Sequence, residues 1–142
     1  MRVILLVILW QISFSVASDE VRWEYDSKRI ADIDCDGYPD EIIIGYLKSK
    51  FQIKVIPSST KIPSIITFGL GDPMQQDGLC GLEVELTFYP SDSDAIEEEF
   101  GEVFEGYKSG PNCLDINLSA GDCDSIHVFW NHDTKHINWW RR

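Results

Sequence analysis

The sequence predicts an α+β fold in which a mainly antiparallel β-sheet carries one amphipathic helix. Most apolar segments are short and rich in β-branched or aromatic residues, which is typical of strands. Only residues 91–110 show a helical hydrophobic period. Four cysteines in an exported chain predict two disulfides. With 142 residues, the chain has a suitable length for one domain with a single core.

The first residues predict export. The segment MRVILLVILWQISFSVAS has one basic residue, then an apolar run, and it reaches the small-residue pattern SVA at residues 15–17. We therefore expect a signal peptide at residues 1–17 and a single mature domain at residues 18–142, periplasmic or secreted. The apolar run is short for a membrane span, and no later segment is long and uncharged enough, so membrane insertion is not expected.

The next apolar segments predict strands. Residues 41–47 (EIIIGYL) and 51–56 (FQIKVI) are joined by a short polar connection and predict a hairpin. Residues 63–69 (PSIITFG) predict a further strand. Residues 82–90 (LEVELTFYP) alternate apolar and polar side chains, which indicates a strand with one face in solvent.

Residues 91–110 (SDSDAIEEEFGEVFEGYKSG) predict the helix. Its apolar residues recur at helical steps and line one side, namely Ile96, Phe100, Val103, Phe104 and Tyr107. Asp94 and Glu97 are expected to form a capping pair, and Gly106 or Gly110 is expected to end the helix. Three closing strands are expected in the segments CLDINL, SIHVFW and HINWW.

The cysteines are Cys35, Cys80, Cys113 and Cys123, for which three pairings are possible. We favour Cys113–Cys123, because CLDINLSAGDC reads as two short strands around a turn that would bring its ends together. Cys35 would then pair with Cys80. A zinc site fits less well, because the chain has no C-x-x-C pair.

The segment DIDCDGYPD, residues 32–40, concentrates aspartates to a degree that opposes compact structure unless a cation lies among them. Positions 1, 3, 5 and 9 of this loop are acidic, position 6 is the turn-forming Gly37, and position 7 can offer its backbone carbonyl. The predicted metal ligands are Asp32, Asp34, Asp36, Tyr38 and Asp40. Hard oxygen ligands of this kind suit Ca²⁺, which is the expected cofactor. The alternative is a solvated acidic turn without metal.

The segment ADIDCDGYPDEIIIG resembles the D-x-D-x-D-G-x-x-D segment of FG-GAP and VCBS-type repeats. The resemblance covers only residues 30–56 and implies a calcium loop set in β structure, with the five predicted ligands at the family's ligand positions. It does not imply a propeller, because the chain holds a single copy. Cys35 departs from the usual motif, and a disulfide there would tie the loop to the rest of the domain. Metal binding and oxidation are therefore expected to be coupled.

Charge and aromatic residues predict a binding function. Without residues 1–17 the formal net charge is −13, which disfavours nucleic acid and anionic membranes and fits a basic protein partner. Trp139 and Trp140 belong to a residue type enriched at binding hot spots, and in a strand they point to opposite faces. One of them is therefore expected to be exposed and to contact a partner. Alternatively, both are covered.

Together these features predict a small exported calcium-binding protein that acts as a protein-interaction module, such as an inhibitor or immunity factor against a cationic extracytoplasmic enzyme. The alternative is a carbohydrate- or ligand-binding module that uses an exposed C-terminal tryptophan. An enzyme is not expected, because no set of nucleophile, base and oxyanion donors is recognisable. His127, His132 and His136 are close in sequence, but their places on strands and a turn need not bring them together.

Overall fold

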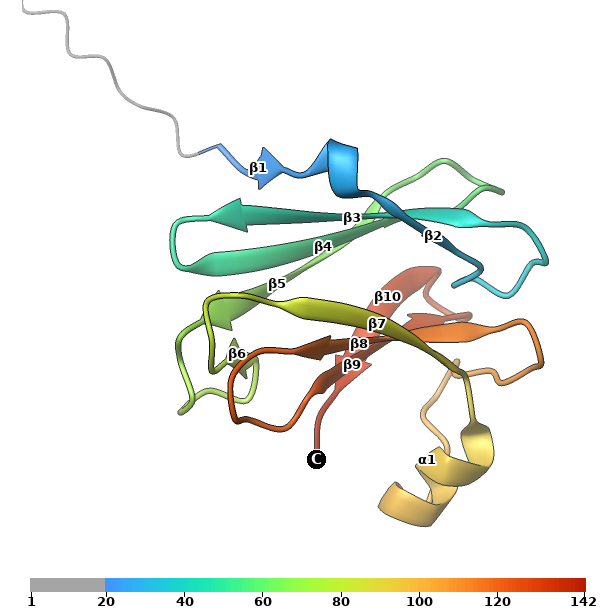
Figure 1. Cartoon of the computed structure of the whole chain (residues 1–142). Helices are drawn as coiled ribbons and strands as arrows, with labels where there is room; N and C mark the ends of the chain where they lie inside the picture. The colour runs from blue at the N-terminus through green and yellow to red at the C-terminus, as the bar shows by residue number, and fades with distance from the viewer. Residues whose placement is uncertain (1–19) are drawn as a thin grey trace, which may run out of the picture.

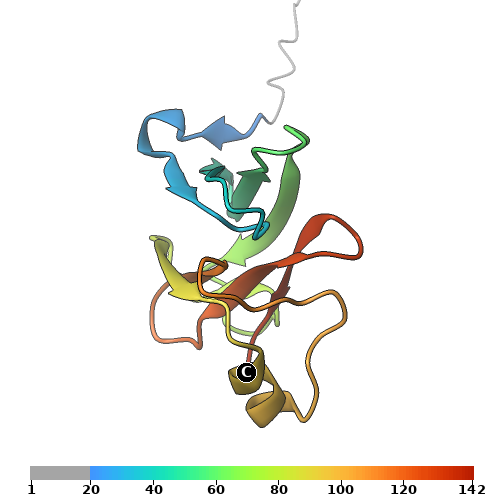
Figure 2. The same cartoon turned by 90° about the vertical axis from the view of Figure 1, so that its right-hand side faces the viewer.

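The computed structural model describes residues 20–142, and the expected signal peptide at residues 1–17 lies outside them. In the described part, two β-sheets form two layers, and one short helix lies beyond the second sheet (Figures 1 and 2). The expected mainly antiparallel β structure with one helix is confirmed. The strands form two sheets rather than one.

The first sheet has the order β1–β3–β4–β5–β6, with β2 also paired to β3. Its strands are β1 (Arg22–Trp23), β2 (Arg29–Ala31), β3 (Asp40–Leu47), β4 (Lys50–Ile56), β5 (Ser64–Leu70) and β6 (Gly78–Leu79), and a 3-10 turn, η1 (Tyr25–Ser27), follows β1. The predicted β3–β4 hairpin is confirmed, and the pairing of Leu47 with Lys50 leaves two residues for its turn. The β5–β6 pair is parallel.

The second sheet is antiparallel and has the order β10–β9–β8–β7. Its strands are β7 (Glu85–Pro90), β8 (Leu114–Ser119), β9 (Ile126–Asn131) and β10 (His136–Trp140). Side chains satisfy two N–H groups of the edge strand β10: Ile137 N donates to Ser64 Oγ (3.0 Å), and Trp139 N donates to Asn138 Oδ1 (2.8 Å). Fewer donors therefore remain on this edge for pairing with another chain.

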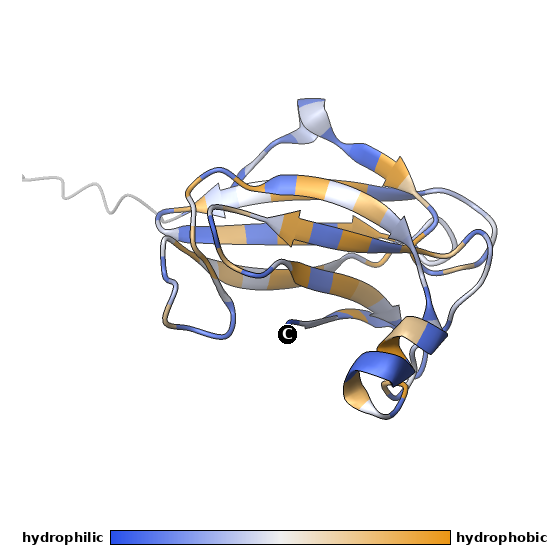
Figure 3. Cartoon of the chain, turned by 60° about the horizontal axis from the view of Figure 1, so that its bottom comes forward, coloured by the Kyte–Doolittle hydropathy of each residue, from blue (hydrophilic) through white to orange (hydrophobic). Residues whose placement is uncertain are grey.

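The main core lies between the sheets and takes side chains from both. The largest fully buried ones include Phe51 and Ile53 of β4, Phe68 of β5, Ile116 of β8 and Val128 of β9. Apolar and polar residues alternate along several strands (Figure 3), as expected for sheets with one covered face. Each such buried side chain contributes about 1.5–3 kcal/mol through removal of apolar surface from water.

The helix is shorter than the predicted residues 91–110. It is α1 (Ser93–Phe100), and it begins at Asp92, whose Oδ1 accepts the N–H groups of Asp94 and Ala95. The expected capping pair of Asp94 and Glu97 is therefore wrong. The helix ends at Gly101, which has the left-handed φ of 81°, and not at either later glycine. Within residues 20–142, no helix has the length and apolar character needed to cross a bilayer.

A second, smaller apolar cluster attaches α1 to the second sheet. Ile96 of α1 packs with Tyr107 and Phe129, and Phe104 and Trp140 cover this group. Phe104 and Tyr107 thus reach the same cluster as the helix, although both lie in the loop after it. The helical period correctly placed Ile96, Phe104 and Tyr107 on one buried side, but Phe100 and Val103 are exposed. Gly101 ends the helix before Phe104 and Tyr107.

Two disulfides are present, but the expected pairing is wrong. Cys35 is bonded to Cys113 and Cys80 to Cys123, with Cα–Cα separations of 4.7 and 5.7 Å. The reason is the length of β8: Cys113 precedes this strand and Cys123 follows it, so about 20 Å of extended chain separates them. Cys113, before β8, instead bonds to Cys35 of the loop between β2 and β3. Cys123, after β8, bonds to Cys80, which follows β6.

Candidate metal centre

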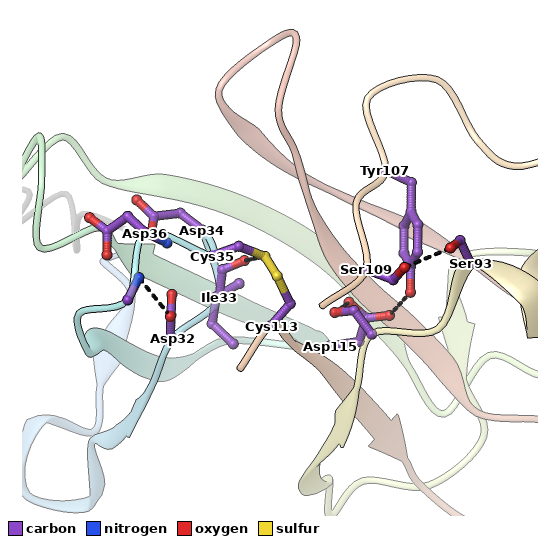
Figure 4. The surroundings of a disulfide bond; sticks show 12 residues. Asp32, Ile33, Asp34, Cys35, Asp36, Ser93, Tyr107, Ser109, Cys113 and Asp115 are labelled. Carbon is purple, nitrogen blue, oxygen red and sulfur yellow. Dashed lines mark hydrogen bonds between the residues drawn. A yellow bond between two sulfur atoms is a disulfide. The ribbon is translucent and has the colours of Figure 1, made fainter. Parts of the chain in front are cut away.

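In the loop between β2 and β3, aspartate side chains accept hydrogen bonds from backbone N–H groups of the same loop. Asp32 Oδ2 accepts the N–H of Gly37 (2.9 Å), and Asp34 Oδ1 accepts the N–H of Asp36 (3.2 Å). Figure 4 shows these aspartates with Cys35 and its disulfide. Gly37 has a φ of 89°, which glycine adopts without steric cost, so the predicted sharp turn at this position is present.

Asp40, the first residue of β3, holds this loop through hydrogen bonds to its carboxylate. Its carboxylate is fully buried, and both oxygens accept backbone N–H groups: Oδ2 from Ile33 (2.8 Å) and Asp34 (3.1 Å), and Oδ1 from Ser58 (2.8 Å). Three charge-assisted hydrogen bonds compensate for the burial of one charge. Asp40 therefore determines the shape of the loop and ties it to the chain after β4.

Three of the predicted ligands come together. Asp32, Asp34 and Asp40 each offer one carboxylate oxygen, and these oxygens lie within 4.8 Å of one another, so the group can hold a metal ion. Oxygens that are 2.3–2.6 Å from a shared calcium ion can be up to about 5 Å apart, so the spacing fits one such ion. Asp32 Oδ1 is buried and has no hydrogen-bond partner among the described residues. An unpaired buried carboxylate oxygen is costly and fits a site built for a cation.

The pKa of Asp34 reflects the repulsion between the carboxylates of this loop. Burial raises the pKa of Asp34, the nearby Asp40 and Asp36 raise it further, and the hydroxyl of Ser59, which donates to Oδ2 (3.0 Å), partly lowers it. The ionised form is disfavoured because charge of the same sign lies close by in a partly dry site. A bound cation would reverse this effect.

The carboxylate of Asp36, another predicted ligand, does not belong to this group of three. Asp36 is exposed, and its Oδ1 accepts the N–H of Tyr38 (2.8 Å). The side chain of Tyr38 is 67% exposed. Ligation by Asp36 and by the Tyr38 carbonyl stays a prediction.

The second sheet also contacts the loop. Leu114 N, at the start of β8, donates to the carbonyl of Asp32 (3.1 Å), next to the disulfide between Cys35 and Cys113. The candidate centre thus lies where the first sheet, the chain after β4 and the start of β8 meet. No pattern in the sequence indicated the contributions of Ser58, Ser59 and Leu114, because each is distant in the chain.

Two of the three histidines lie near the acidic loop. His132 and His136 line a cavity of about 460 Å³ together with Asp34 and Asp36. Burial, followed by the charges of Lys108 and Lys135, lowers the pKa of His132, which favours the neutral imidazole. Among the described residues, no hydrogen bond joins a histidine side chain to a carboxylate.

His127 and the two tryptophans lie elsewhere. Trp139 packs against the main core and contacts Phe68 edge-on, with ring centroids 5.8 Å apart. Trp140 packs against the second cluster and stacks on His127 at 3.9 Å. The tryptophans therefore point to opposite faces as expected, but both are partly buried, and neither forms an open aromatic platform.

No protein-family model, curated protein or solved structure matches this chain.

Proposed function

We propose that this chain is a small exported calcium-binding protein in which one ion and two disulfides brace a scaffold for binding another protein. The observation that carries the proposal is the set of three carboxylate oxygens within 4.8 Å of one another, including the side chain of Asp32 with its unpaired buried Oδ1. Oxygen-only donors suit Ca²⁺ or Mg²⁺ better than Zn²⁺. Calcium is the better fit, because it tolerates irregular geometry and many oxygen ligands.

The ion would act as a structural brace. It would neutralise carboxylates that repel one another, and it would hold a loop that is already bonded to Ser58, Ser59 and Cys113. For a site with a Kd of about 0.1 mM at about 1 mM free calcium, mass action adds about 1.4 kcal/mol to stability. This is a useful contribution for a small domain.

Export is supported by two observations. Two disulfides favour an oxidising compartment outside the cytoplasm. The pattern of residues 1–17 matches a signal peptide. The periplasm and secretion are the two locations that fit both observations.

The partner that we propose is a protein with a basic surface. The chain has a formal net charge of −12, and charge of opposite sign speeds association and favours the correct partner. A cationic enzyme outside the cytoplasm that this protein inhibits, or against which it gives immunity, fits this charge and this location.

The metal proposal is tested by melting the protein in EDTA, in 1 mM calcium and in 1 mM magnesium. We expect calcium to raise the Tm of the wild type and to leave Asp32→Ala unchanged. Asp124→Ala removes one exposed carboxylate outside the group of three and should respond like the wild type. Equal responses of Asp32→Ala and wild type would refute the site.

The partner proposal is tested with immobilised protein and a panel of folded cationic and anionic proteins. Capture of no cationic protein would refute it.

A ligand-binding module is the second candidate, and one cavity favours it. This cavity of about 320 Å³ lies between α1 and the second sheet and is lined by Asp115, Asn117, His127 and Trp140, among others. An aromatic ring beside several polar side chains is typical of small-ligand sites. Titration with a glycan panel while tryptophan fluorescence is recorded would test it. No spectral shift with any glycan would exclude carbohydrate of the tested kinds.

A further inference from the structure

A groove of about 520 Å³ lies beside the loop that follows α1. Glu102, Phe104 and Glu105 of this loop line one part of it, and Phe129, Asn138 and Trp140 of β9 and β10 line another. Trp139 and Trp140, the two candidates for contact with a partner, both line it.

The charge of this groove has one sign. Glu102 and Glu105 are exposed, and neither has a basic side chain within ion-pair distance in the described part of the chain. Among the described residues, no lysine, arginine or histidine lines the groove. The glutamates of α1 do not line the groove, and Glu99 pairs with Arg142 (3.3 Å).

Aromatic side chains line part of the groove, namely Phe104, Phe129, Trp139 and Trp140. The ring of Phe104 stacks on Phe129, with centroids 5.8 Å apart and planes at 21°, and it lies 6.2 Å from Trp140. Phe100 and Val103 beside it are 38% and 37% exposed. The partly exposed rings of Phe104 and Trp140 next to unpaired carboxylates suit a planar cation, which can contact a ring and form two parallel hydrogen bonds to a carboxylate.

We propose that this groove receives an arginine side chain of the basic partner protein. The inference rests on the proposed protein-binding function and assigns it a surface and a recognised residue. Arginine is preferred over lysine, because a guanidinium matches both the rings and the carboxylates, whereas an ammonium group is a point charge. Strand addition at the β10 edge beside the groove is disfavoured, because side chains already accept hydrogen bonds from two of its N–H groups.

The test uses three labelled nine-residue peptides in which glycine alternates with arginine, lysine or citrulline. Their binding to the folded full domain is followed by fluorescence anisotropy in 1 mM calcium. We compare wild type with Glu102→Gln/Glu105→Gln. The matched control is Glu97→Gln/Glu98→Gln, which removes the same charge from exposed residues of α1 that do not line the groove. We expect the groove variant to bind the arginine peptide about tenfold more weakly and the control to stay within about twofold of wild type.

Three results would overturn the inference. Equal weakening in both variants would mean that overall charge, and not the groove, attracts the peptide. Binding of citrulline or lysine peptide as tight as that of arginine peptide would remove the assigned residue. If no peptide binds while folded cationic proteins are still captured, this inference fails and the proposed function stands. If neither peptides nor cationic proteins bind, the proposed protein-binding function itself fails.

Discussion

Replacing Asp40 by alanine should destabilise the protein even without calcium. The buried carboxylate accepts three backbone N–H groups, from Ile33, Asp34 and Ser58, at 2.8–3.1 Å. An unpaired buried donor costs about 1–3 kcal/mol, and water can reach the two partly buried N–H groups, so we expect a total loss of about 3–5 kcal/mol. This is a large part of the stability of about 5–15 kcal/mol that is usual for a domain.

Urea unfolding in EDTA measures this effect. With a slope of about 2 kcal/mol per molar urea, the midpoint should fall by about 2 M. Asp40→Asn keeps the shape but replaces one acceptor by a donor, so it should lie between alanine and wild type. Asp36→Ala is the control, because it loses only an exposed hydrogen bond to Tyr38 and should cost about 1 kcal/mol or less. If Asp40→Ala costs no more than Asp36→Ala, Asp40 does not organise the loop.

Three further predictions concern other parts of the molecule. Gly45→Val places a Cβ 2.7 Å from the Trp23 ring, so it should displace the N-terminal segment and cost about 1–3 kcal/mol in urea unfolding; an unchanged midpoint would contradict this packing. Peptide mapping under non-reducing conditions should recover Cys35 linked to Cys113. Loss of that bridge, with its separation of 78 residues, should cost about 4.5 kcal/mol, against about 4.0 for the bridge of separation 43, and recovery of any other pairing would contradict the fold. Burial and the charge of Arg142 lower the pKa of His127, so the unfolded chain takes up its proton first and stability should fall as the pH drops below 6.5. His127→Phe keeps a ring against Trp140 and should weaken that dependence in thermal melts; an unchanged profile would show that His127 is not its source.

The strands were predictable because their signals are local. Alternation and β-branched residues identified the β3–β4 hairpin and the three closing strands within a residue or two. The arrangement in two sheets was not predictable, because a period shows which side of a strand is covered but not which other strand covers it. The same limit applies to the disulfides, since chain proximity between Cys113 and Cys123 says nothing about what lies beside each end of β8.

The hydrophobic period that predicted the helix was only partly correct, because Phe100 and Val103 are exposed. Phe104 and Tyr107 do share a buried side with Ile96, as the spacing predicts. Gly101, with its left-handed backbone, nevertheless ends the helix. Phe104 and Tyr107 pack against Phe129 from the loop that follows the helix. Tertiary contacts thus bury Phe104 and Tyr107 beside Ile96 without a continuous helix.

The candidate site was partly predictable from spacing alone. The loop brings Asp32, Asp34 and Asp40 together as the motif indicates. Asp40 also accepts the N–H of Ser58, 18 residues away, and no pattern in the sequence predicts this hydrogen bond. The sequence also does not predict that His132 lies near the loop, because this depends on how the two sheets face each other.

A calorimetric calcium titration of the oxidised protein tests the central claim most directly. We expect one ion per chain with a Kd of about 0.1–1 mM, loss of binding in Asp34→Ala, and wild-type binding in Asp124→Ala. No binding at millimolar calcium, or unchanged binding in Asp34→Ala, would contradict the claim that the β2–β3 loop is a calcium site.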